Sequence, residues 1–119
     1  MADHNILGKD GEKIALEMLQ NKGYKILETN WRFKRDEIDI IAIDNDELVI
    51  VEVKTRSTDF FGDPEDAVDE AKMHRLVNAA NEYIEQNNME LECRYDIISV
   101  IINNKTSDVR HIKDAFFPS

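Results

Sequence analysis

The stretch from Leu48 to Lys54, with the sequence LVIVEVK, constrains the fold more than any other part of this chain. Its aliphatic residues predict a β-strand that is covered on both faces, as is typical of a short apolar run. Side chains alternate along a strand, so Glu52 and Lys54 share a face with Ile50. Because burial of unpaired charge is costly, Glu52 and Lys54 form either an exposed ion pair at the strand's end or part of a functional site.

A second strand is predicted over residues 37–43, and the two strands form a hairpin around an acidic turn. If that turn contains an even number of residues, Asp39 directly faces Glu52. The same register places Glu37 opposite Lys54. An odd turn would instead place Asp39 opposite a valine and remove the pairing.

Two carboxylates that face each other across a hairpin repel, since cross-strand partners have Cβ atoms about 4.5 to 5.5 Å apart. A divalent cation would remove this repulsion, and carboxylate oxygens are the ligands that Mg²⁺ and Mn²⁺ prefer. Asp39 and Glu52 are therefore candidate metal ligands, with Lys54 beside the metal. The turn at residues 44–47 lacks the glycine and the distal glutamate of a calcium loop, and we interpret it as solvated.

A helix is predicted over residues 8–22, because apolar side chains recur at a period of 3.6 residues and Gly23 supplies a stop. Glu12 lies at the edge of the apolar stripe. It is either a surface carboxylate near the positive end of the helix or an acid that faces the core. It is the one acid of this helix that is placed to do so.

A second helix is predicted to open at Asp63 and Pro64, a good N-cap and first helical residue, and to run to about Gln86. Its buried stripe contains Val68 and includes Lys72. The stem of such a lysine can follow the apolar surface into water. Alternatively, the ammonium of Lys72 points at the acidic hairpin or at a phosphate.

Three further strands are predicted, over residues 24–29, 94–102 and 108–112, and the tail at residues 115–117 is expected to pack back on the domain. Between the first two strands, the segment NWRFKR at residues 30–35 mixes basic and aromatic side chains. It fits two interpretations equally well. It could stack on nucleic acid, or Trp31 and Phe33 could be core residues beside solvated cations.

Composition limits the classes of protein that fit. A chain of 119 residues, 42% hydrophobic and 34% charged, predicts one globular domain. No stretch approaches the length of a membrane span, no leader pattern is visible, and a single cysteine, Cys93, fits a reducing cytoplasm. The net charge of −10 argues against indiscriminate nucleic-acid binding, although divalent cations could bridge acidic residues to a polyanion.

The order of these residues resembles the PD-(D/E)XK nuclease superfamily, whose signature is an Asp followed by Glu-x-Lys on adjacent strands. The pattern of the whole chain is similar to the bacterial YraN family, which is grouped with endonucleases and is similar in core to archaeal Holliday-junction resolvases. The matching positions are Gly11-Glu12 with Ala15 and Leu19, Gly23-Tyr24, Asn30, Arg32, Glu37-Ile38-Asp39, Val51-Glu52-Val53-Lys54, Arg56, Gly62, Pro64, Ala67-Val68, Lys72, Tyr95-Asp96, His111-Ile112 and Ala115-Phe116. One departure is Asp36, where that family usually has glycine.

The resemblance implies a single nuclease-like domain over residues 1–119. Its expected fold is α/β, a restriction-endonuclease-like core with a central mixed β-sheet of about five strands flanked by helices. It also implies a metal site for Mg²⁺ or Mn²⁺. Asp39, Glu52 and the backbone carbonyl of Val53 would hold the ion, and Glu12 would complete the site directly or through water.

The implied activity is metal-dependent hydrolysis of phosphodiester bonds in DNA, selective for branched or junction structures, in the cytoplasm. Glu12, Asp39, Glu52 and Lys54 are the implied catalytic residues. Lys54 would orient or help deprotonate the attacking water, or stabilise the charge that develops on the phosphate. Arg32, Arg56 and Lys72 are candidates for contacts to the nucleic-acid backbone, which position a substrate without reading its sequence. A homodimer would suit a junction with two scissile strands. The alternative is a non-catalytic nucleic-acid-binding or protein-interaction module that retains the nuclease fold.

Overall fold

The computed structural model describes residues 4–57, 68–103 and 107–118, with only the backbone of residues 4–7. In this part of the chain two helices and five strands follow in the order α1 (His4–Asn21), β1 (Lys25–Phe33), β2 (Asp36–Asp44), β3 (Glu47–Arg56), α2 (Glu70–Gln86), β4 (Glu92–Ile102) and β5 (Ser107–Phe116). Neither helix is long and apolar enough to cross a lipid bilayer.

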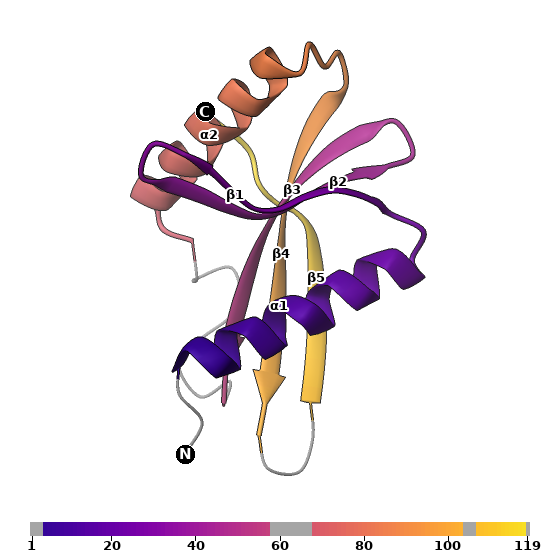
Figure 1. Ribbon diagram of the computed structural model, residues 1–119, viewed down its shortest axis with the longest axis vertical. Coiled ribbons are helices and arrows are strands. Elements are labelled where there is room, and N and C mark those ends of the chain that lie inside the picture. The colour runs from indigo at the N-terminus through magenta and orange to yellow at the C-terminus, as the bar shows by residue number, and fades with distance from the viewer. Residues whose placement is uncertain (1–3, 58–67, 104–106, 119) are drawn as a thin grey trace.

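The five strands form one mixed sheet in the order β1-β2-β3-β4-β5 (Figure 1). β3 and β4 are parallel, and the other three neighbouring pairs are antiparallel. The parallel pair requires a crossover, and α2 lies within that crossover. The predicted α/β architecture with a mixed sheet of about five strands is therefore confirmed.

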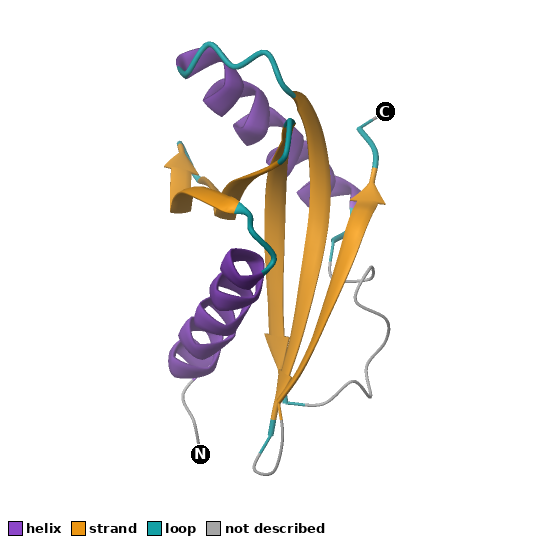
Figure 2. Ribbon diagram, turned by 90° about the vertical axis from the view of Figure 1, so that its right-hand side faces the viewer, coloured by secondary structure: helices purple, strands orange, loops and turns teal. Residues whose placement is uncertain are grey.

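The sheet has a helix on each face (Figure 2), and each helix closes a separate hydrophobic cluster. Ala15 and Leu19 of α1 pack with Val51 and other aliphatic residues on one face. On the other face, Leu76, Ala79, Ala80 and Tyr83 of α2 pack with Leu48, Ile50, Ile97 and their neighbours. The alternation expected for β3 is thus observed, since successive residues contribute to opposite clusters.

The β2–β3 hairpin has the even turn on which the predicted metal site depended. Asp44 pairs with Glu47, and the register continues to Ile40 opposite Val51. Asn45, the first of the two turn residues, has φ 55°, a left-handed conformation that asparagine tolerates. The register would bring Asp39 opposite Glu52, but the backbone ladder ends one residue before that pair.

At that point β2 leaves β3 and continues beside β1 alone. The β1–β2 pairing extends to Phe33 opposite Asp36, with Arg32 opposite Glu37. In Figure 1 the two strands accordingly run across the direction of β3, β4 and β5. The predicted position of Glu37 opposite Lys54 is wrong, because this half of β2 keeps β1 as a neighbour but is no longer paired with β3.

Other boundaries differ from the sequence predictions in informative ways. α2 begins at Glu70, where the Asp69 carboxylate caps the helix by accepting a 2.8 Å hydrogen bond from the Lys72 backbone N–H. Val68 is buried but precedes the helix. The predicted start at residues 63–64 lies outside the described residues.

The aromatic residues of β1 belong to the packed structure. Trp31 contacts Tyr83 of α2 edge to face, with ring centroids 5.1 Å apart, and Phe33 stacks on Trp31 at 6.5 Å. Trp31 is therefore packed against the core, as one interpretation expected, whereas Phe33 is half-buried and belongs to neither hydrophobic cluster. Stacking of this segment on nucleic acid stays a prediction. At the C-terminal tail, Phe116 is buried, whereas Phe117 is 76% exposed, so only part of the tail packs back.

Candidate metal centre

Asp39 lies where β2 and β3 separate, and its carboxylate takes up one of the hydrogen bonds that the missing ladder would have made. Val53 of β3 donates its backbone N–H to Asp39 Oδ2 at 2.7 Å. Burial and the negative charge of Glu52 raise the pKa of Asp39 to about 8, with a further contribution from Glu12. The Val53 N–H and the ammonium of Lys72 act in the opposite direction. A raised pKa of this kind indicates that the ionised Asp39 carboxylate has too little positive charge around it.

Glu12 and Glu37 join Asp39 in an acidic triad that could hold a metal ion. One carboxylate oxygen from each of the three lies within 4.8 Å of the others. Ligand oxygens lie about 2.0 to 2.6 Å from Mg²⁺ or Ca²⁺, so two ligands of one ion are at most about 5 Å apart. The donor set of three carboxylates and the spacing of their oxygens therefore fit a hard divalent cation.

Asn30 contributes an amide to the same cluster. With its side chain oriented by its hydrogen-bond partners, Nδ2 donates to Glu37 Oε1 at 2.8 Å and to both oxygens of Glu12 at 3.3 Å. Neither Asn30 nor Glu37 was predicted as a site residue. Glu37 had a visible signal, because it lies two residues before Asp39 in a strand and so on the same face.

The position of Glu12 depends on a close approach between α1 and β3. Gly11 is buried, and a Cβ atom added to it would overlap the side chain of Thr55. Only glycine lets the helix backbone come so near to the strand. The neighbouring Glu12 is thereby held at the separation between β2 and β3.

Glu52 is 7% exposed and lies on the face of β3 that α2 covers. Lys72 of α2 binds it, with 2.7 Å between Nζ and Oε1. Of the interpretations open for Lys72, the structure shows the ammonium pointing at the acidic hairpin. Glu52 is near enough for its charge to raise the pKa of Asp39, but it lies outside the triad of Glu12, Glu37 and Asp39.

Two cavities meet at Asp39. The larger, of about 290 Å³, lies between β2 and α2 and is lined by Arg35, Asp36, Glu37, Asp39, Glu52, Lys72, Arg75 and Leu76. The smaller, of about 200 Å³, lies between α1 and β1 and is lined by Lys9, Glu12, Lys13, Leu16, Thr29, Asn30, Asp39 and Ile40. Solvent and small ions therefore reach Asp39 from both sides of the split.

The remaining predicted site residues lie around this centre with differing partners. Arg32 is exposed and pairs with Glu37 at 2.9 Å. Lys54 is exposed and lines neither cavity. Arg56 is half-buried at the end of β3. The structure thus brings Glu12, Asp39, Glu52 and Lys72 to one place, and the roles predicted for Lys54, Arg56 and the Val53 carbonyl stay predictions.

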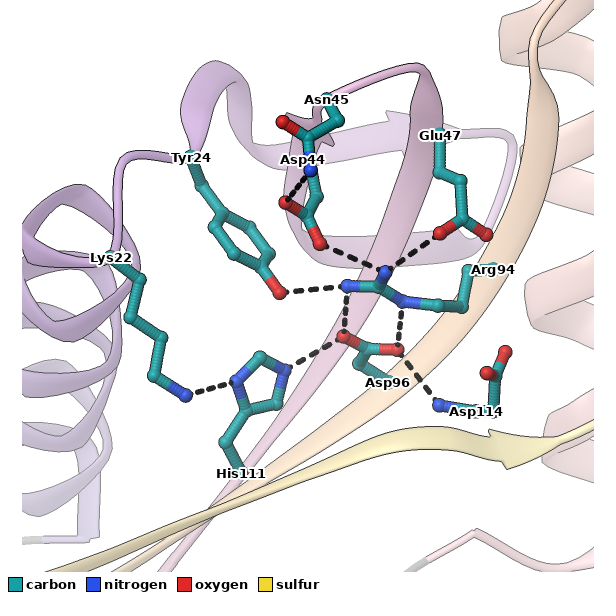
Figure 3. A network of polar contacts seen from close by, with 9 residues as sticks. All are labelled: Lys22, Tyr24, Asp44, Asn45, Glu47, Arg94, Asp96, His111 and Asp114. Atoms are coloured by element: carbon teal, nitrogen blue, oxygen red, sulfur yellow. Dashed lines mark hydrogen bonds and ion pairs between the residues drawn. The ribbon is translucent and has the colours of Figure 1, made fainter.

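A second polar cluster, centred on Arg94 of β4, lies beside the β2–β3 turn (Figure 3). Arg94 donates from Nε and Nη2 to Asp96, at 2.9 and 3.1 Å. It donates from Nη1 to Asp44 at 3.0 Å and to Glu47 at 3.1 Å, and from Nη2 to Tyr24 Oη at 2.8 Å. The arginine therefore joins four segments of the chain.

Asp96 is 1% exposed and receives two further hydrogen bonds, from His111 Nε2 at 2.7 Å and from the Asp114 backbone N–H at 3.1 Å. Lys22 Nζ lies 2.9 Å from His111 Nδ1. Because an ammonium can only donate, Nδ1 accepts and Nε2 carries the proton. Burial acts to raise the pKa of Asp96, but the hydrogen bonds from His111 and Arg94 outweigh it and lower that pKa. This network is a satisfied structural junction.

The fold and the site define a class: a mixed-sheet α/β protein with a carboxylate cluster, suited to a divalent cation, where two central strands separate. The chain belongs to the uncharacterised protein family UPF0102, whose model matches residues 11–100. It is 55% identical over 117 residues to the UPF0102 protein FP2501 of Flavobacterium psychrophilum, covering 98% of each chain. UPF0102 proteins of Christiangramia forsetii and Bacteroides thetaiotaomicron are each 48% identical to it, with 98% or more of each chain covered.

Proposed function

We propose that this protein is a divalent-metal-dependent DNA endonuclease that hydrolyses phosphodiester bonds in branched or junction DNA. The observation that carries the proposal is Asp39. Its carboxylate lies at the split between two strands, with a pKa raised to about 8 and two further carboxylates within reach of one cation. Such perturbed groups in a cavity are typical of functional sites.

Asp39, Glu12 and Glu37 are the residues that would hold Mg²⁺ or Mn²⁺, with Glu52 and the Val53 carbonyl as the ligands expected from the PD-(D/E)XK resemblance. A bound divalent cation supplies charge that stabilises the phosphate in the transition state and eases deprotonation of the attacking water. Asn30 orients Glu12 and Glu37 through its amide, and the Val53 N–H orients Asp39. Lys54 is proposed to orient the attacking water.

Cationic side chains near the cavity are proposed to contact the phosphate groups of the DNA backbone. Lys72 lines the cavity, Arg32 is exposed next to Glu37, and Arg56 ends β3. Contacts of this type go to phosphate and carry no base information, so selectivity for DNA shape is expected. The proposal includes a nuclease-like domain of the PD-(D/E)XK type, a possible homodimer at a junction and a cytoplasmic location.

The test is cleavage of labelled four-way junction, flap and single-stranded DNA in Mg²⁺ or Mn²⁺. Wild type should cleave the branched substrates, and Asp39→Asn, Glu12→Gln and Glu52→Ala should each lower the rate by at least about 100-fold, as expected when a metal or charge-stabilising group is lost. Glu17→Gln is the matched control for Glu12, because Glu17 is exposed on the same helix. Intact DNA in every reaction, with no calorimetric signal for Mn²⁺, would refute the proposal.

One observation favours a second function, a module that binds nucleic acid without cleaving it. Lys54 lies outside both cavities, and Glu52 already has Lys72 as its partner. In that case the junction DNA would bind and remain intact with every metal. An Asp39→Asn variant would then bind DNA as well as wild type, and the lack of cleavage by wild type is what separates this function from the endonuclease.

A further inference from the structure

The ion pair between Lys72 and Glu52 joins two groups of unequal exposure. The Glu52 side chain is 9% exposed, whereas the Lys72 side chain is 37% exposed. The carboxylate is thus fixed within β3, while the ammonium reaches it from a helix surface. Rotation of the Lys72 side chain would return its ammonium to water, but it would leave the buried Glu52 without the one cationic partner that it has among the described residues.

An unpartnered buried carboxylate is costly, so Lys72 leaves Glu52 most readily when another cation takes its place. The cation proposed for this centre would arrive beside Asp39, whose charge is already coupled to that of Glu52. A divalent ion there would neutralise Glu52 more effectively than one ammonium does. The two cations are therefore alternatives for the same carboxylate.

The freed ammonium would remain at the wall of the larger cavity. Arg75 lies three residues after Lys72 on the same face of α2, and Arg35 lines the cavity from the β1–β2 turn. In a protein with a net charge of −10, these three cations share the cavity with four carboxylates, those of Asp36, Glu37, Asp39 and Glu52. Once a divalent cation offsets the charge of the carboxylates, a phosphate group is the ligand that suits the three cations.

We propose that Lys72 is a displaceable counter-ion, which holds Glu52 until a divalent cation reaches the acidic centre and then binds a phosphate group of the DNA. This inference rests on the proposed function and adds a thermodynamic coupling between metal binding and DNA binding. Metal and DNA bind cooperatively, because the metal releases the lysine that the DNA needs.

The first test is the Mn²⁺ affinity of the whole protein by calorimetry, without DNA. Lys72→Met removes the competing cation and should tighten Mn²⁺ binding about three- to tenfold, or about 0.7 to 1.4 kcal/mol. Arg75→Gln is the matched control, because it removes one positive charge from the same helix face, whereas Lys72 is the residue of this helix that is paired with Glu52. It should change the affinity less than about twofold, since exposed charges are screened. Equal effects of the two variants would overturn the inference.

The second test is the binding of a fluorescein-labelled four-way junction, followed by anisotropy and with the DNA checked intact on a denaturing gel. Without divalent cation, Lys72→Met should change the affinity of wild type less than about twofold, because Lys72 is held by Glu52. In a Glu52→Gln background, whose neutral amide holds the ammonium weakly, the same substitution should weaken binding about three- to tenfold. With Ca²⁺ present it should weaken binding of the otherwise wild-type protein by a similar factor.

A loss of the same size in all three settings would overturn the inference, because Lys72 would then contact DNA regardless of Glu52. Failure of the proposed function has a different signature. A protein that never cleaves DNA can still show the metal and DNA effects of Lys72→Met, and an active nuclease can lack them.

Discussion

Replacement of Asp39 by asparagine should stabilise the protein at alkaline pH. The ordinary pKa of this carboxyl is 3.8, and in the folded chain it is about 8, chiefly through burial and then through repulsion by Glu52. Each pH unit corresponds to about 1.4 kcal/mol, so the shift of about four units amounts to roughly 6 kcal/mol between the two protonation states. Water that reaches the partly exposed carboxylate reduces this, and we expect a gain of about 2 to 3 kcal/mol in the free energy of unfolding.

The sign of the pH dependence follows from the proton balance. The unfolded chain releases this proton near pH 4 and the folded chain near pH 8, so the folded state holds more protons in between. The free energy of unfolding of wild type should therefore fall as the pH rises through this range, and then level off. Asparagine keeps an oxygen that can accept the Val53 N–H, so the variant retains that hydrogen bond while losing the charge.

The assay is urea unfolding at a series of pH values from 5 to 9, with a chelator present. Asp39→Asn should exceed wild type increasingly from pH 5 to about pH 8, and the difference should then level off towards pH 9. Asp46→Asn, at the exposed turn of the same hairpin, is the control and should show no such divergence. Added Mg²⁺ should restore stability to wild type at pH 8 and not to Asp39→Asn. If Asp39→Asn is less stable than wild type at pH 9, the electrostatic reasoning is wrong.

Two further substitutions test how the site is supported. Gly11→Ala should destabilise the protein by about 1 to 3 kcal/mol, because the added Cβ overlaps Thr55. Gly8 has open space around it, so Gly8→Ala should be neutral or stabilising by up to about 1 kcal/mol. Thermal unfolding of both variants tests this difference. Asp96→Asn should cost about 3 to 5 kcal/mol in urea unfolding at pH 7, against less than about 1 kcal/mol for Asp108→Asn in an exposed ion pair. Because the pKa of Asp96 is lowered, its contribution is complete above the ordinary aspartate range and is lost as the pH falls through the lowered pKa, so wild type and Asp96→Asn should converge in acid.

The β2–β3 hairpin could be predicted because local signals agreed. The apolar alternation, the acidic turn and the even spacing all pointed to one register, and the structure has that register from Asp44 opposite Glu47 to Ile40 opposite Val51. The end of the ladder could not be predicted in the same way. β1 stays paired with one edge of β2 as far as Phe33, whereas the opposite edge of β2 loses β3 after Ile40. The pattern of a single hairpin does not indicate where its two strands diverge.

The residues of the acidic centre could likewise be predicted only in part from the sequence. Asp39 and Glu12 were identified from their positions within a strand and a helix, and both are in the triad. Glu37 was assigned a partner on β3 that the departure of β2 removed. Asn30 reaches the cluster from β1, and its own backbone is left-handed, with φ 52°. No periodic pattern in a sequence indicates this backbone conformation.

The Arg94 network was beyond sequence reasoning for another reason. Its members come from the connection between α1 and β1, the β2–β3 turn, β4 and β5, and no short spacing relates them. What the sequence offered was a strand at residues 94–102 with charged residues near its beginning. Only the assembled sheet places those charges beside Tyr24 and His111.

The residues that stabilise the fold and the residues of the acidic centre, which lies where β2 separates from β3, are different sets. The two hydrophobic clusters and the Arg94 network hold the protein together without Glu12, Asn30, Glu37 or Asp39. The acidic centre therefore behaves as a replaceable binding site on a fold that other residues stabilise. We expect the fold to be retained when the donor atoms of this site are exchanged, as in Asp39→Asn or Asp39→His. The position therefore offers a place to install other metal-binding chemistry on a chain of 119 residues.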